Sequence, residues 1–194
     1  MATATARSYP VTFDVGYPQE LSRWLIFVKW LLSIPHYIIL YFLQIAQFVV
    51  IFIAFFAILF TKKYPRSLFN FVVGVNRWYA NYYVYLLLLR DEYPPFTMEQ
   101  SEYPVTYNVE YPEELSRWMI FVKWLLIIPN AIVMVIVTFV AYLVTFAAFF
   151  IILFTKKYPE SLFTFVVGAL RWSQRVNAYV MLLRDEYPPF SMQP

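Results

Sequence analysis

The chain of 194 residues has no cysteine, three glycines and one histidine, His36. Without cysteine there can be no disulfide, thiolate metal site, cysteine nucleophile or palmitoylation site. So few glycines cannot form a glycine-rich phosphate loop, and neither a nucleophile–base pair nor a metal-ligand spacing is present. These absences predict that the protein is not an enzyme and has no catalytic residues and no metal centre.

Charged residues are also scarce. They make up 14% of the chain, against 61% hydrophobic residues, whereas roughly 25% is usual in globular domains. Two stretches of 32 residues, 30–61 and 124–155, contain no aspartate, glutamate, lysine or arginine, and His36 is the one histidine in them; ~20 apolar residues suffice to cross a bilayer as a helix. The composition therefore predicts an integral membrane protein. The small net charge of +3, with scattered basic residues, argues against a nucleic-acid partner.

One unit is written twice in the chain. Residues 9–97 recur as residues 103–191 at a constant offset of 94, so that Trp24 returns as Trp118 and Lys29 as Lys123. A gapless repeat predicts two halves that fold alike and pack on each other. We expect a first repeat over residues 1–98 and a second over 99–194.

Each repeat has the same predicted order of elements. Period-two alternation over 9–15 and 103–109 predicts short strands, and 93–96 and 187–190 are further extended pieces. Pro35 and Pro129 stand where helices begin. The expected helices are interfacial segments at 19–34 and 113–128, and spans at 35–61, 66–90, 129–155 and 160–184.

Together these elements predict an all-α membrane bundle of four transmembrane helices with a small β-sheet on the terminal face. An even number of spans per repeat returns the chain to its starting side, so the halves should be parallel repeats about an axis along the membrane normal. The sheet should lie outside the hydrocarbon, where its edges can be hydrated.

The interfacial segments combine a thin basic face with tryptophans, a composition suited to lipid headgroups. The alternative is an ordinary extension of the following span. The expected interfacial anchors are Arg23, Trp24, Lys29, Trp30, Arg117, Trp118, Lys123 and Trp124.

A polar stripe runs along the second span of each repeat and includes Gly74 and Gly168, which would permit close helix approach. Intramembrane arginines are costly and are candidates for function. They could simply bind the bundle together through carbonyls, line a pore, or converge on a carboxylate, phosphate or lipid headgroup. The candidate anion site consists of Arg77, Asn81, Arg171 and Arg175.

His36 could in principle ligate a metal or a tetrapyrrole, but its counterpart in the second repeat is Asn130. A paired histidine site is therefore absent. No cofactor is expected apart from bound lipid, and a pigment or haem accessory role is the weakest alternative.

The phrases Tyr-Pro-Gln-Glu-Leu-Ser-Arg-Trp-Leu-Ile-Phe-Val-Lys-Trp-Leu-Leu-Ser-Ile-Pro-His, ending at His36, and Leu-Leu-Arg-Asp-Glu-Tyr-Pro-Pro-Phe, ending at Phe96, carry a resemblance to a known family. The chain resembles DUF4389, a bacterial membrane family of unknown function, over both units. The resemblance implies a multi-spanning bacterial membrane protein and supplies no activity or ligand.

These observations favour a non-enzymatic membrane scaffold or accessory subunit, with lipids and another membrane protein or its own copies as partners. The alternative is an anion or lipid-headgroup binding or transport module. The expected location is the bacterial inner membrane. No cleavable signal peptide is recognised, and the count of lysines and arginines, seven on the terminal face against five on the other, favours cytoplasmic termini.

Overall fold

The computed structural model describes residues 9–194, so residues 1–8 of the predicted first repeat, Arg7 among them, lie outside the described part. The elements are β1 (Val11–Val15), α1 (Leu25–Leu32), α2 (Ile34–Thr61), α3 (Arg66–Leu86), β2 (Val105–Val109), α4 (Met119–Leu126), α5 (Ile128–Thr155) and α6 (Glu160–Val180).

Proline and left-handed residues set the ends of the long helices. Pro35 lies in the first turn of α2, where its missing N–H costs no helical hydrogen bond. The helix ends at Lys62, whose φ of 60° is left-handed, and Pro65 then caps the start of α3. Lys156 and Pro159 repeat this turn between α5 and α6. Both turns thus use lysine where helices commonly use glycine.

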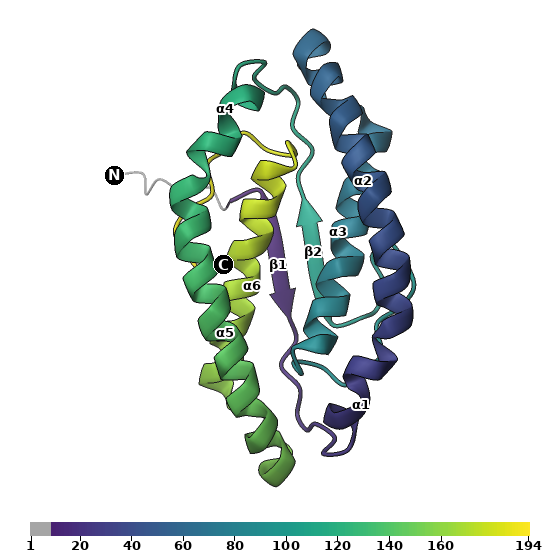
Figure 1. Cartoon of the computed structure of the whole chain (residues 1–194), viewed down its shortest axis with the longest axis vertical. Coiled ribbons are helices and arrows are strands. Elements are labelled where there is room, and N and C mark those ends of the chain that lie inside the picture. The colour runs from purple at the N-terminus through teal and green to yellow at the C-terminus, as the bar shows by residue number, and fades with distance from the viewer. Residues whose placement is uncertain (1–8) are drawn as a thin grey trace, which may run out of the picture.

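The elements lie side by side in a slab. Across Figure 1 they follow one another as α5, α6, β1, β2, α3 and α2, and neighbours in this order are in contact. The two strands pair antiparallel, with Phe13 opposite Tyr107. Their alternate residues are buried beneath one face of the sheet, and the other face, with Thr12 and Asp14, is exposed. The period-two strands predicted from the sequence are confirmed.

The halves exchange their leading segments. The strand β1 of the first half packs on α6 of the second half, and β2 packs on α3 of the first. Beyond the strands, the backbone N–H of Leu21 donates to the carbonyl of Lys156 at 2.8 Å, and Leu115 donates to Lys62 at 2.8 Å. Each leading segment therefore builds the core of the sister half.

These contacts place the start of α1 beside the end of α5, and the start of α4 beside the end of α2. The long helices α2 and α5 consequently run in opposite directions, as Figure 1 shows. The prediction that corresponding helices of the two halves run in the same direction, as upright parallel repeats require, was wrong. It followed from counting spans, whereas the linker 87–104 and strand β2 carry the chain to the other end of the slab before α4 begins.

The position of the sheet and the extent of some elements also differ from prediction. The strands lie alongside the middle of the helices and not at one end of a bundle. The extended pieces at 93–96 and 187–190 do not join the two-stranded sheet. The predicted interfacial helices are shorter, at eight residues each, because residues 19–23 and 113–117 bind the turns of the other half.

Two segments, Leu25–Thr61 and Ile128–Thr155, are long and apolar enough to cross a membrane, which is weak evidence for a membrane location. Only 17% and 22% of their most apolar stretches are buried, unlike the core helix of a soluble protein. The helices α3 and α6, predicted as further spans, do not meet this criterion. They lie between the long helices and the strands, with about half of their residues buried.

Candidate functional site

Arg77 and Arg171 hold the outer edges of the sheet. The Nε of Arg171 donates to the carbonyl of Phe13 at 2.8 Å, and the Nε of Arg77 donates to the carbonyl of Tyr107 at 3.1 Å. Phe13 and Tyr107 are the central pair of the sheet. A two-stranded sheet leaves both of its edges unpaired, so each arginine satisfies one edge from the helix beside it.

The same guanidinium groups also bind the extended segments that follow α3 and α6, both of which are called linkers below. The Nη1 of Arg77 donates to the Met98 carbonyl at 2.8 Å, and that of Arg171 to the Met192 carbonyl at 2.9 Å. Arg171 further pairs with Asp14, at 2.9 Å from Nη2 to Oδ1. Backbone carbonyl groups of the protein thus accept hydrogen bonds from both arginines. This is the arrangement expected in the alternative in which the arginines stabilise the bundle.

The glycines of the polar stripe make room for these linkers. A Cβ built on Gly74 would lie 2.8 Å from the Cβ of Met98, and one on Gly168 would lie 2.8 Å from that of Met192. The close approach expected at these glycines is therefore made by an extended linker, not by another helix.

Asn81 and Arg175 occupy equivalent positions of the two halves but differ in residue type, and both are buried. The Nη1 of Arg175 reaches the Ser191 carbonyl at 3.3 Å and its guanidinium lies over the ring of Tyr9, but its Nε has no partner among residues 9–194. The four predicted anion-site residues fall into two groups, one on α3 and one on α6, and in each group the first arginine binds a strand edge. Their role in anion binding stays a prediction.

Lys29 and Lys123 are not exposed anchors. Lys29 is 1% exposed, and its Nζ lies 2.9 Å from Asp91 Oδ1 and donates to the Arg90 carbonyl at 2.6 Å. The basic stripe of α1 therefore faces inward, because the chain returns 62 residues later with a carboxylate. Sequence reasoning missed this partner, although the Lys-to-Asp spacing is the same in both repeats.

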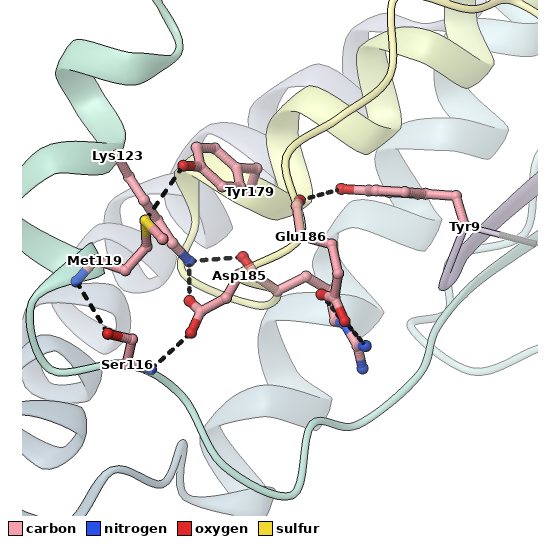
Figure 2. A network of polar contacts seen from close by, with 8 residues as sticks. Tyr9, Ser116, Met119, Lys123, Tyr179, Asp185 and Glu186 are labelled. Carbon is pink, nitrogen blue, oxygen red and sulfur yellow. Dashed lines mark hydrogen bonds and ion pairs between the residues drawn. The ribbon is translucent and has the colours of Figure 1, made fainter. Parts of the chain in front are cut away.

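Figure 2 shows the equivalent cluster in the second half. Lys123 pairs with Asp185 at 2.8 Å and donates to the Arg184 carbonyl, and the other oxygen of Asp185 accepts the backbone N–H of Ser116 at 2.6 Å. One carboxylate thereby joins the start of α4, its lysine and the end of the α6 segment. Nearby, the Tyr9 hydroxyl donates to the Glu186 carbonyl at 2.9 Å and ties the first half to this cluster.

The remaining predicted anchors are exposed. Trp24 is 81% and Trp118 80% exposed, and Trp30 and Trp124 are also exposed. Arg23 and Arg117 lie on the surface as well, where each donates to the carbonyl of a phenylalanine at the end of the opposite long helix, Phe154 and Phe60.

His36 and Asn130 have the same role. The indole Nε1 of Trp78 donates to His36 Nδ1 at 2.9 Å, and that of Trp172 donates to Asn130 Oδ1 at 2.7 Å. The His36 ring is fully buried and stacks on Phe96 with centroids 3.9 Å apart. Nδ1 is thus occupied by tryptophan, and no group of three possible metal ligands forms among residues 9–194.

Two exposed acidic residues, Glu92 and Glu186, form local pairs with arginines. Arg90 binds Glu92 through Nε at 2.9 Å, and this hydrogen bond holds the pKa of the Glu92 carboxyl below its usual range. Arg184 and Glu186 repeat the pair. Each of these two acids is thus salt-linked to the arginine two residues before it.

A family model for a domain of unknown function, DUF4389, matches the chain twice, over residues 23–98 and 117–192. The chain belongs to the DUF4389 family. No curated protein and no solved structure matches it. Both DUF4389 units begin just after the exchanged leading segments, so each matched unit comprises one short helix, two long helices and the linker that follows.

Proposed function

We propose that this DUF4389 protein is a non-enzymatic membrane scaffold or accessory subunit that lies flat in one leaflet, with its long axis parallel to the membrane. In this arrangement α2 and α5 rest in lipid, and the strands and linkers face water. The observation that carries the proposal is the segregation of charge between these two layers.

The apolar layer is extensive. Beyond the short helices, exposed large hydrophobic side chains run along both long helices, from Tyr37 to Phe60 and from Ile132 to Phe154. Each helix is buried along only a narrow stripe, so most of its circumference is apolar and exposed. A surface of this size is typical of contact with lipid or another protein.

The polar layer holds the acidic residues. None of the twelve acidic side chains lies on α1, α2, α4 or α5, and only Glu160 lies on any helix. Because α2 and α5 share a core with the buried face of the sheet, its exposed face points away from them. Asp14 on that face has a side chain 73% exposed.

An upright orientation fits these charges less well. The strands lie alongside the middle of the long helices (Figure 1), so a slab standing across the bilayer would hold the exposed face of the sheet, with Asp14, near the midplane. Each charge there costs at least ~2.5–3.5 kcal/mol. Lying flat keeps this face in water, and the exposed tryptophans of α1 and α4 then reach the headgroup boundary.

Cysteine labelling tests the orientation on a chain that has no native cysteine. Lys62→Cys and Lys156→Cys lie at opposite ends of the slab, and Glu102→Cys lies on the linker. In sealed vesicles, an impermeant thiol reagent should label all three from the same side. Labelling of Lys62→Cys and Lys156→Cys from opposite sides would contradict the flat arrangement.

Crosslinking in native membranes followed by purification tests the scaffold role. A defined partner protein, or a ladder of the protein's own copies, is expected. A monodisperse protein that captures no partner and does not self-associate would contradict this role.

A further inference from the structure

A cavity of about 230 Å³ lies where α5 and α6 meet the end of α3. Its polar wall consists of Thr138, Ser173, Gln174 and Asn177, and Tyr83 and Tyr142 stand at one side. A second hollow of about 440 Å³ adjoins it along α5, shares Leu87 and Tyr142 with it, and is otherwise lined almost entirely by apolar residues. Together the two form one elongated site with a polar and an apolar end.

The site belongs to the second half because smaller residues stand there. In the first half, Gln47 donates to Asn76 at 2.9 Å, and the Tyr79 hydroxyl donates to the Leu40 carbonyl at 3.3 Å. At the offset of 94 residues the second half has the smaller Ala141 and Ser173 in place of Gln47 and Tyr79, and the apolar Leu170 in place of Asn76. The repeat thus shows which side chains would fill the space.

The polar wall has unused hydrogen-bonding capacity. Within residues 9–194, the side chains of Ser173, Gln174 and Asn177 make no hydrogen bond, although Gln174 is only 5% exposed. Ser173 and Asn177 are half-buried, and the polar atoms of all three side chains are accessible, so they can hydrogen-bond to a ligand with carbonyl or hydroxyl oxygens in the cavity. No lysine, arginine, aspartate, glutamate or histidine lines either hollow, so a charged head would be desolvated without compensation.

The apolar end suits a long chain. The lining residues of α5 extend from Met134 to Phe149, ~22 Å at 1.5 Å per residue. Tyr142 and Phe146 are exposed on this stretch, on the layer assigned above to lipid. A lipid tail could therefore lie along α5 while its head enters the cavity.

We propose that this site binds one neutral lipid, with an uncharged carbonyl- or hydroxyl-bearing head and an acyl or isoprenoid tail. The proposal rests on the membrane placement above. The recognised chemistry is shared by glycerides, quinones and long-chain alcohols, and the head contacts Ser173, Gln174 and Asn177.

The test compares lipid bound to the full chain purified from native membranes, and thermal stabilisation of the delipidated chain by monoolein, a short-tailed ubiquinone and oleate. We expect about one neutral lipid per chain and a raised midpoint with monoolein or the quinone, because a ligand that binds the folded state stabilises it. Whichever of the two acts identifies the source. Equal stabilisation by ionised oleate, or an absence of neutral lipid together with no stabilisation by either neutral probe, would overturn the proposal.

Ser173→Tyr inserts the side chain that the first half uses, and its hydroxyl faces the Met134 carbonyl as Tyr79 faces Leu40. It should reduce lipid retention at least tenfold, a loss of about 1.4 kcal/mol of binding free energy. Ser161→Tyr makes the same change at an exposed position of α6 and should retain the lipid. Equal retention by the two variants would contradict the assignment.

Gln174→Leu provides a second variant that keeps the volume and removes the amide, and it should abolish the preference for neutral polar heads over a plain alkane. An unchanged preference would count against the polar wall as the head site. If the cysteine-labelling pattern is as proposed and lipid binding fails, the lipid site alone is wrong, since the labelling does not depend on it.

Discussion

The buried pair Lys29–Asp91 allows a quantitative prediction. Asp91→Asn leaves the Lys29 ammonium, 1% exposed, with the Arg90 carbonyl and no carboxylate. Removing one partner of a buried ion pair costs about 3–5 kcal/mol. Because the Asp91 side chain is 24% exposed, we expect the lower end of this range, about 3 kcal/mol. The asparagine oxygen can still accept the Ser22 N–H, so the change removes charge and little geometry.

Thermal unfolding of the purified chain in a mild detergent measures this cost. For 150–250 residues, 1 kcal/mol corresponds to roughly 2–4 °C, so Asp91→Asn should lower the midpoint by roughly 6–12 °C. Lys29→Met combined with Asp91→Asn should recover much of the loss, because no unpaired charge then remains buried.

The second repeat supplies an independent replicate. Asp185→Asn, next to Lys123, should lower the midpoint by a similar amount because its distances and burial match those in the first half. A shift of less than 2 °C for both aspartate variants, or a double variant less stable than Asp91→Asn alone, would refute the reasoning that the charge is effectively buried.

Three further substitutions test other features in the same assay. Gly74→Ala should destabilise the chain by about 1–2 kcal/mol, since overpacking against Met98 outweighs the gain in helix propensity; an unchanged or higher midpoint would show that the linker yields freely. Lys62→Gly should raise the midpoint, because a left-handed lysine costs about 1 kcal/mol that glycine avoids; a lower midpoint would contradict this. Arg171→Met should destabilise more than Arg77→Met, since Arg171 also binds Asp14, and the reverse order would show that this ion pair adds nothing.

Local pattern explains the parts of the fold that were correctly predicted. The alternation around Phe13 and Tyr107 predicts strands because one face of the sheet is buried and the other is wet. Pro35 and the charged Lys62 turn delimit α2 within one residue of the prediction. These features depend on residues that are close to one another in the sequence, so the sequence pattern alone predicts them.

Features that depend on distant contacts could not be read in this way. The basic stripe of α1 was correctly recognised, but its direction depends on Asp91, which lies 62 residues further along. A repeat implies that the two halves fold alike, but it does not determine the rotation that relates one half to the other. The mismatch of His36 with Asn130 ruled out a paired histidine site, but the sequence did not reveal that both side chains accept a hydrogen bond from a tryptophan that is itself repeated.

The exchange of leading segments has a consequence for how such a molecule can arise. Each unit gives its strand and its turn-binding segment to the other unit. Neither unit can therefore complete its hydrophobic core alone. A single unit made alone is therefore expected to complete itself with a second identical copy, as a domain-swapped homodimer with twofold symmetry. The present chain joins both copies in one polypeptide, so its halves need not be identical, and they differ at Tyr79 and Ser173. One half can then acquire a separate role while the other half keeps the residues that maintain the fold.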